Sequence, residues 1–187
     1  ARFGQAKVLV VERFDRKLAA DKSWIMRLPQ EDMCQATSTP PGRKYESDGG
    51  PGIKSIMEIL LGSTRSEADR REFYRAQIAF WMLCAIDGHA KNFSLFIERG
   101  GGYRLTPLYD VLSAYPLMGH GAKKLSPQNA KMAMAVWGKN RHYGWKEIEA
   151  RHFIHTGNDC GLSPATCTAI MNELLDKTPT VIEIVAQ

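Results

Sequence analysis

The segment from residue 78 to residue 110 constrains the fold of this chain more than any other. It begins with residues 78–86, an apolar stretch whose helical pattern has apolar side chains on every face, as in a helix at the centre of a domain. Two short apolar stretches follow, residues 93–97 and 103–106, and the sequence ERGGG between them has glycines that supply the positive φ angles of a tight turn. The segment therefore predicts a central helix that leads through a polar loop into an antiparallel β-hairpin.

The predicted hairpin brings three polar side chains to one end. Asp87 and Asn92 precede its first strand, and Asp110 follows its second strand. Carboxylate and amide oxygens are ligands suited to Mg²⁺ that also holds phosphate oxygens. The spacing Asp-x-x-x-x-Asn is that of the protein-kinase catalytic loop, where the Asp accepts the proton of the attacking hydroxyl and the Asn and a later Asp hold metal. An Asp-Gly pair alone is more often a simple turn, so the order of helix, loop, hairpin and Asp110 carries the argument.

The remainder of the chain predicts an α+β fold that is mostly helical. Residues 8–11 (VLVV) predict a strand buried on both faces, and residues 24–28 a returning strand. The stretch 37–52, rich in Ser, Pro and Gly, predicts a long loop. Ser66 to Asp69 resembles a capping box that opens the central helix. Further helices are predicted at residues 30–36, 53–61, 126–136, 146–155 and 163–175.

Composition limits the class of protein. A chain of 187 residues with 44% hydrophobic residues is long enough to bury its own core as one large or two small domains. No apolar run approaches eighteen residues and no secretory signal precedes the first strand, which argues against a membrane or secreted protein. The four cysteines are too few and too irregularly spaced for a disulfide scaffold or a zinc site. A cytoplasmic protein with reduced thiols is expected.

Positive charge is concentrated in one segment. Between His120 and Arg151, seven basic residues are opposed only by Glu147 and Glu149, so this segment holds the whole net charge of +5. Such a zone attracts nucleic acid or an acidic partner, although a solvated lysine-rich face is the simpler explanation of composition alone. The seven are Lys123, Lys124, Lys131, Lys139, Arg141, Lys146 and Arg151.

Five separated stretches carry a resemblance to a known family. They read VLVVERFDRK, RLPQEDMCQ, KYESDGGPGI, IDGHAKNFSLFI and YRLTPLYDVLSAYP. Together they resemble HipA-type serine/threonine kinase toxins of bacterial HipBA toxin–antitoxin modules, most specifically over residues 8–116 and more weakly after His120. The resemblance implies a protein-kinase-like C-terminal lobe with a catalytic-loop β-hairpin over residues 29–187. Residues 1–28 would then be the last strands of an N-terminal lobe and the nucleotide hinge.

The resemblance also implies the roles of individual residues in the use of ATP and Mg²⁺. Asp87 matches the catalytic base, and Asn92 and Asp110 match the pair that holds Mg²⁺. The hinge that binds adenine through its backbone matches Glu12, Arg13 and Phe14. Residues expected beside the nucleotide are His89, Lys91 and Tyr109, although a surface lysine and core aromatic residues are the simpler alternatives for Lys91, Tyr109 and Phe14. Val111-Leu112 replaces the Phe-Gly that usually follows the metal-binding Asp.

The function implied is transfer of the ATP γ-phosphate to a protein hydroxyl. By resemblance the substrate is an aminoacyl-tRNA synthetase, in particular glutamyl-tRNA synthetase, and the partners are a HipB-like helix-turn-helix antitoxin and, through that complex, operator DNA. The chain has no glycine-rich phosphate loop and no strand lysine, so we expect it to be part of a larger protein. The alternative is a non-catalytic co-repressor module on DNA, which the intact set of Asp87, Asn92 and Asp110 disfavours.

Overall fold

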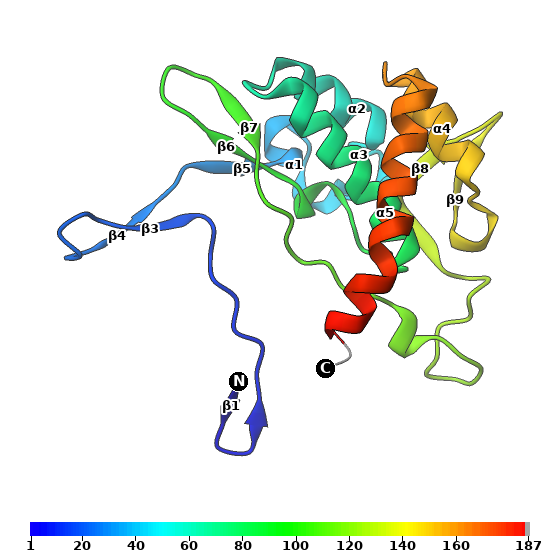
Figure 1. Cartoon of the computed structure of the whole chain (residues 1–187), viewed down its shortest axis with the longest axis horizontal. Coiled ribbons are helices and arrows are strands. Elements are labelled where there is room, and N and C mark those ends of the chain that lie inside the picture. The colour runs from blue at the N-terminus through cyan, green and yellow to red at the C-terminus, as the bar shows by residue number, and fades with distance from the viewer. Residues whose placement is uncertain (186–187) are drawn as a thin grey trace.

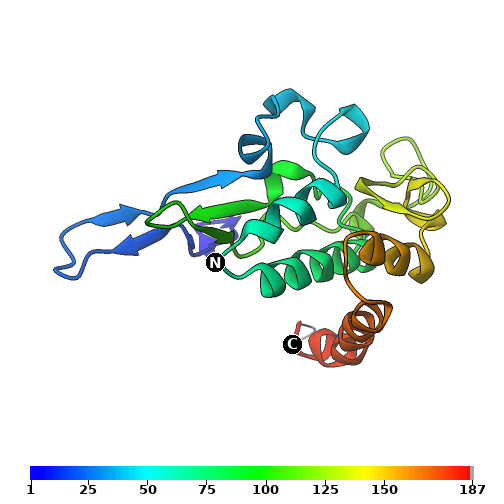
Figure 2. The same cartoon turned by 90° about the horizontal axis from the view of Figure 1, so that it is seen from above.

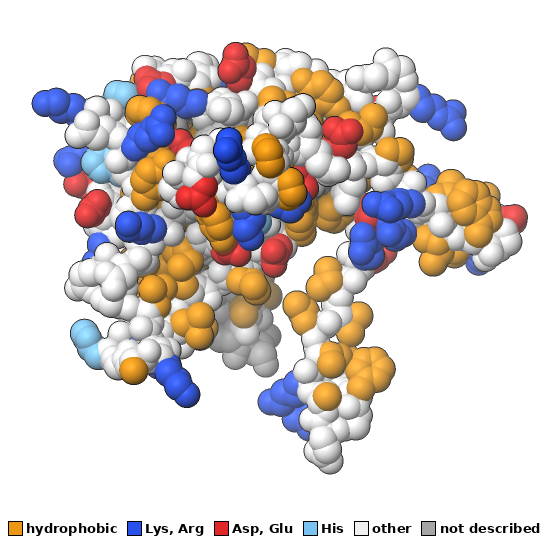
Figure 3. Space-filling model, turned by 180° about the vertical axis from the view of Figure 1, so that it is seen from behind, with side chains coloured by type: hydrophobic (Ala, Val, Ile, Leu, Met, Phe, Trp, Pro, Cys, Tyr) orange, Lys and Arg blue, Asp and Glu red, His pale blue; other side chains and the backbone are white. Residues whose placement is uncertain are grey.

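The structure is a computed structural model that describes residues 1–185. Its N-terminal arm consists of two antiparallel hairpins, which stand away from the body of the molecule on the left of Figure 1. Figure 3 shows the arm from behind, with hydrophobic side chains along it. The strands of the arm are β1 (Arg2–Phe3), β2 (Ala6–Lys7), β3 (Arg16–Leu18) and β4 (Ile25–Arg27).

Over the described residues, the body is built from two small sheets and five α-helices. One sheet is antiparallel in the order β5-β6-β7, and a second is the β8-β9 hairpin. Figure 2 shows the helices packed beside the first sheet, with the end of α5 projecting from the body. The strands are β5 (Gln30–Asp32), β6 (Ser94–Ile97), β7 (Tyr103–Leu105), β8 (Lys131–Trp137) and β9 (Arg141–Gly144). The helices are α1 (Met33–Ala36), α2 (Ile53–Ile59), α3 (Ser66–Met82), α4 (Ala150–Asp159) and α5 (Pro164–Val185).

Helix α3 forms the centre of the hydrophobic core. Its aromatic residues Phe73 and Phe80 are almost fully buried and pack on Phe93, with ring centroids 4.9 and 5.6 Å apart. Tyr74, also buried, donates a hydrogen bond to the carbonyl of Phe153 in α4. The helix thus joins the β5-β6-β7 sheet to the C-terminal helices, and its end fixes where the following polar loop emerges.

Several predicted elements are confirmed. The β6-β7 hairpin pairs Leu95 with Leu105 and Ile97 with Tyr103, as the sequence predicted for residues 93–106. The helix predicted at 53–61 is α2, which ends slightly earlier. Within residues 1–185, no helix combines the length and the apolar character that a membrane crossing requires.

The buried strand predicted at residues 8–11 is wrong. This stretch has no regular structure, and Leu9, Val10 and Val11 are 87%, 68% and 70% exposed. The returning strand predicted at 24–28 does form, as β4, but its partner is β3. A β-branched run needs neighbouring strands to bury it, and the described residues offer none beside it.

The helix predicted at residues 30–36 is only partly correct, because the first three residues form β5 and pair with β6. A capping box then begins α1: the Asp32 carboxylate accepts from the amide of Gln35, whose side chain accepts from the amide of Asp32. The box predicted at Ser66 is wrong. Asp69 binds the hydroxyl of Ser63 and the amide of Leu105 instead, and so ties the start of α3 to β7.

The helix predicted at residues 126–136 is also wrong, because Lys131–Trp137 is strand β8, paired with β9. Its residues 132–136 are all buried, so the alternation of an amphipathic strand is missing from the sequence. The C-terminal helices do form, but α4 begins at Ala150 and α5 continues to Val185. The central helix ends at Met82, and Leu83 is 47% exposed, so the apolar stretch to residue 86 is not entirely helical or buried.

Candidate active site

A short closed turn follows α3 and holds the candidate base. The chain leaves the helix through Cys84, which has a positive φ of 48°. The amide of His89 donates to the carbonyl of Asp87 at 2.8 Å, and the side-chain amide nitrogen of Asn92 donates to the same carbonyl at 2.9 Å. Asn92 is 3% exposed. The Asp87 backbone is therefore fixed from within the turn, while its carboxylate faces outward.

Asp110 lies directly after the β6-β7 hairpin, on the far side of it from Asp87 in the sequence. His89 is 4% exposed, and its Nε2 lies 3.9 Å from an oxygen of Asp87. Burial lowers the pKa of His89, and Asp87 and Asp110 oppose that shift as negative charges. Asp110 has a φ of 57°, a left-handed conformation that is uncommon for residues other than glycine and is several-fold enriched in Asp and Asn.

The oxygen atoms of this site suit a hard cation. The amide nitrogen of Asn92 is used in its bond to the Asp87 carbonyl, which leaves its side-chain oxygen as the atom that could bind a cation. Oxygen-only sets that leave positions for phosphate are typical of Mg²⁺. Among residues 1–185 there is no group of three or more His, Cys, Asp or Glu side chains that could hold a metal ion by themselves. The donor set fits a cation that is shared with a phosphate ligand.

Lys91 is held by an ion pair. Its ammonium donates to Asp32 Oδ2 at 2.6 Å, and this bond raises the pKa of Lys91. Because Asp32 also caps α1, the pair joins the turn after α3 to that helix. The phosphate contact predicted for Lys91 competes with this pair in the observed arrangement.

The predicted hinge meets the site through aromatic rings. The ring of Phe14 lies 5.7 Å from that of Tyr109 and 5.7 Å from that of Phe96. The hydroxyl of Tyr109 donates to the carbonyl of Lys91 at 2.7 Å and is hydrogen-bonded to Ser94 at 2.6 Å. Tyr109 therefore connects the hinge, the hairpin and the turn.

The side chains of the other two hinge residues, Glu12 and Arg13, are directed away from the Asp87 turn. The guanidinium of Arg13 binds both carboxylate oxygens of Asp15, at 2.8 and 2.7 Å, and Glu12 is exposed. Asp15 is 2% exposed, and its bonds to Arg13 lower its pKa to about 2. This cluster shapes the chain beside Phe14, and the side chains of Glu12 and Arg13 are not brought to the Asp87 turn.

Sequence reasoning missed Tyr45, whose hydroxyl donates a hydrogen bond to Oδ1 of Asp87. The two residues are 42 positions apart, so no local pattern connects them. The only signal was indirect, because Tyr45 lies in KYESDGGPGI, one of the stretches that carried the family resemblance.

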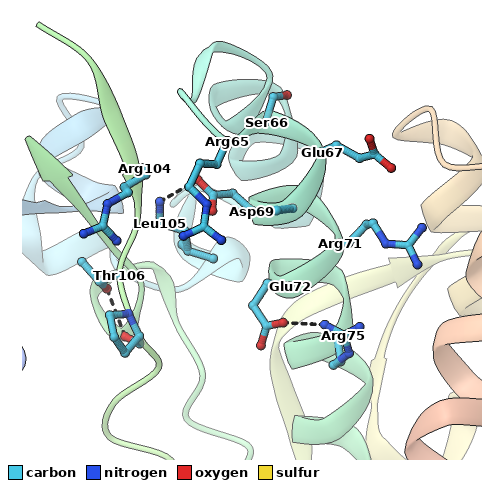
Figure 4. Close-up of a pocket in the computed structure, with 12 residues that line it drawn as sticks. Arg65, Ser66, Glu67, Asp69, Arg71, Glu72, Arg75, Arg104, Leu105 and Thr106 are labelled. Atoms are coloured by element: carbon cyan, nitrogen blue, oxygen red, sulfur yellow. Dashed lines mark hydrogen bonds and ion pairs between the residues drawn. The ribbon is translucent and has the colours of Figure 1, made fainter. Parts of the chain in front are cut away.

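A cavity of about 880 Å³ lies away from these residues, between the start of α3 and β7. Figure 4 shows the side chains that line it, among them Asp69, which bonds to the amide of Leu105, and Arg75, which pairs with Glu72. It contains none of the predicted site residues. Its arginines are Arg65, Arg71, Arg75 and Arg104.

Comparison with a solved structure establishes the fold first. The whole chain superposes with a TM-score of 0.86 and 21% identity on 43% of a chain in the complex of HipA, HipB and operator DNA from Shewanella oneidensis. The fold is thus one found in toxin–antitoxin assemblies. The model of the HipA-like C-terminal domain family matches residues 1–182, and this chain belongs to that family.

Two relatives extend the comparison. The chain is 35% identical over 173 residues to the putative kinase Y4mE of Sinorhizobium fredii, a match that covers 91% of this chain. It is 32% identical over 122 residues, 59% of this chain, to the serine/threonine-protein kinase toxin HipA of Shewanella oneidensis. The matches span 38% and 28% of the lengths of these relatives.

Proposed function

We propose that this chain is the C-terminal lobe and nucleotide hinge of a serine/threonine protein kinase toxin, with the lobe at residues 29–187 and the hinge within residues 1–28. The observation that carries the proposal is the closed turn from Asp87 to Asn92 directly before the β6-β7 hairpin. Asp110 follows that hairpin, and its charge reaches the same buried His89 as the charge of Asp87. Phosphoryl transfer requires a positioned base and metal ligands, and the order of turn, hairpin and Asp110 supports assigning these roles to the three residues.

The residues of the turn have separable tasks in this proposal. Asp87, exposed at the mouth of the turn, accepts the proton of the attacking hydroxyl. The Asn92 oxygen and Asp110 would hold Mg²⁺, which neutralises phosphate charge and aligns the phosphates when Mg-ATP is bound. We assign buried His89 and nearby Lys91 to the phosphate groups of ATP. Lys91 could bind a phosphate only when its ion pair with Asp32 is broken.

The hinge supplies the adenine end of the nucleotide site. Glu12, Arg13 and Phe14 lie outside any strand. The Arg13 carbonyl accepts from the amide of Arg16 at 3.3 Å, and the remaining N–H and C=O groups of the segment would serve the edge of a base. The paired rings of Phe14 and Tyr109 would form an apolar wall for it.

The proposed partners follow from the solved complex of a similar protein, and the proposed substrate follows from the resemblance to HipA-type toxins. The matching HipA of Shewanella oneidensis is a serine/threonine-protein kinase toxin, and the similar fold was solved with HipB and operator DNA. We propose a HipB-like helix-turn-helix antitoxin and operator DNA as partners, and an aminoacyl-tRNA synthetase, in particular glutamyl-tRNA synthetase, as substrate. Since bacterial synthetases and operators are cytoplasmic, so is the proposed reaction.

A transfer assay with the full-length protein tests the proposal. Purified glutamyl-tRNA synthetase and dephosphorylated casein are each incubated with the protein, Mg²⁺ and radiolabelled ATP, and the Asp87→Asn variant is the matched control. We expect label in the synthetase with the wild-type protein and no label with the Asp87→Asn variant. Label in casein but not in the synthetase would contradict the substrate, and label in neither protein would contradict the kinase itself.

A further inference from the structure

Tyr45 is the side-chain donor that meets the carboxylate of the candidate base. Its hydroxyl donates to Oδ1 of Asp87, whose side chain is otherwise 56% exposed. This bond and partial burial raise the pKa of Tyr45 to about 12, so the phenol stays a neutral donor at physiological pH. Hydrogen bonds to an ionised acceptor are about twice as strong as neutral ones, so this contact biases the orientation of the carboxylate.

Tyr45 is fixed to the turn that carries Asp87. The amide of Ala90 donates to the carbonyl of Lys44 at 3.2 Å, which attaches the backbone of the 37–52 loop to the turn. The Tyr45 ring also packs edge-on against His89, with centroids 5.1 Å apart and planes at 84°. These two contacts fix the position of the Tyr45 hydroxyl relative to the turn.

The far side of the loop is braced against the body. Glu46, the neighbour of Tyr45, accepts a 2.6 Å hydrogen bond from the amide of Ala135 in β8. A Cβ at Gly52 would overlap the Glu46 carboxylate, and one at Gly50 would overlap the carbonyl of Arg43. The glycines therefore allow a close-packed loop, and the Tyr45 hydroxyl is presented by a rigid support.

An exposed aspartate side chain can rotate between several orientations, and the hydrogen bond from Tyr45 restricts the orientation of Asp87. We infer that Tyr45 is a positioning residue that holds Oδ1 of Asp87 and leaves Oδ2 to accept the proton of the attacking hydroxyl. The inference rests on the proposed kinase function. Small misplacements of a catalytic group lower rates by up to about a hundredfold. Loss of the Tyr45 hydroxyl is expected to lower kcat by about ten- to a hundredfold without changing how ATP binds.

The test is a Tyr45→Phe substitution in the full-length protein, with the readout being transfer from radiolabelled ATP to whichever of glutamyl-tRNA synthetase and dephosphorylated casein the wild type labels. The rate is expressed per ATP site counted by calorimetric titration, so that any loss of folded protein is removed from kcat. The matched control is Tyr103→Phe, which deletes a hydroxyl that donates to the carbonyl of Ile59 at 2.7 Å, outside the site. We expect a lower kcat for Tyr45→Phe, an unchanged KM for ATP, and wild-type values for Tyr103→Phe.

The outcomes separate the inference from the function on which it rests. If the wild type transfers phosphate, Asp87→Asn does not, and Tyr45→Phe keeps the wild-type kcat, the positioning role is wrong and the kinase stands. A higher kcat in Tyr45→Phe would also overturn it, because the tyrosine would then be obstructing the acceptor. If the wild type transfers nothing, the kinase proposal fails and the inference fails with it.

Discussion

The ring of Phe14 lies against the ring of Tyr109, with centroids 5.7 Å apart and planes at 41°. This contact joins the segment before β3 to the residue that directly precedes Asp110. Because the Tyr109 hydroxyl also donates to the carbonyl of Lys91, one side chain connects the proposed adenine wall with the proposed phosphate side. Nucleotide affinity should therefore depend on Phe14, although Phe14 is far in sequence from the turn.

We predict that Phe14→Ala in the full-length protein weakens Mg-ATP binding by about two- to tenfold. In the proposed site the Phe14 ring contacts adenine, and an aromatic contact of this kind contributes about 0.5–1.5 kcal/mol beyond its buried area, which corresponds to this range. Calorimetric titration measures the change. Phe14→Tyr keeps the ring and should bind like the wild type. Equal affinities for all three proteins would show that this ring does not line the nucleotide site.

A second prediction is that Asp87 and Asp110 fail in different ways. Asp87→Asn keeps the shape of the side chain but removes the base, so Mg-ATP should still bind while transfer falls by about 10²–10⁴-fold. Asp110→Ala removes a metal ligand, so the Mg²⁺-dependent part of ATP affinity should be lost together with transfer. Titrations with and without Mg²⁺, beside a transfer assay, distinguish the two. Unchanged Mg-ATP binding by Asp110→Ala would contradict its assignment as a ligand.

The part of the site that the sequence predicted is local in the chain. Asp87 and Asn92 are five residues apart and lie between a helix and a hairpin whose glycine turn is explicit in the sequence. Turn chemistry and short-range hydrogen bonds are enough to define such a segment. The contact of Tyr45 with Asp87 depends instead on how the 37–52 loop packs on β8, which no local pattern expresses.

The two main errors have a common physical cause. Residues 8–11 and 132–137 are both apolar runs without alternation, and such a run is compatible with a buried strand or a buried helix. In the first case the described residues provide no sheet, so the run is exposed. In the second case Ala and Met favour a helix intrinsically, but pairing with β9 and packing on α4 favour the strand β8.

Asp32 has a different task for each carboxylate oxygen, which makes a third prediction. Oδ1 accepts from the Gln35 amide at 2.9 Å and caps α1, whereas Oδ2 binds Lys91. Asp32→Ala should lower the free energy of unfolding by about 1–2 kcal/mol, mainly through loss of the cap. Asp32→Asn retains a cap and loses only the partly exposed ion pair, at a cost of less than about 1 kcal/mol. Urea unfolding measures both, and equal losses would contradict this division.

A fourth prediction concerns the seven lysines and arginines of the segment 120–151, all of which are exposed. Reversing Lys123, Lys124 and Lys139 to Glu should weaken operator binding by the antitoxin complex. It should also reduce the slope of log affinity against log salt by about one for each DNA phosphate that is no longer bound. The control reverses the exposed Lys7, Lys17 and Lys22, which changes net charge equally. If both triple variants have the same slope, net charge alone is responsible.

The last prediction follows from two imidazole rings, those of His142 and His152, which stack with centroids 4.0 Å apart and planes at 9°. His152 is 6% exposed, and its Nδ1 accepts a 3.2 Å hydrogen bond from the amide of Glu149 at the start of α4. Burial, and then the charges of His142, Arg151 and His155, lower the pKa of His152 below its usual 6.5, against the opposing charge of Glu149. The folded protein therefore holds this ring neutral at pH values where the unfolded chain already binds a proton.

Because the unfolded state binds more protons in that range, stability should be complete above about pH 6.5 and should decrease as the pH falls below it. Urea midpoints measured at about pH 7.5 and 5.5 detect this difference. His142→Phe keeps a stacked ring but removes its positive charge, so the decrease between the two pH values should become smaller. His120→Gln is the control, since His120 is exposed and is not among the charges that shift the pKa of His152. An identical pH dependence for the wild type and His142→Phe would show that charge on the neighbouring ring does not destabilise the fold.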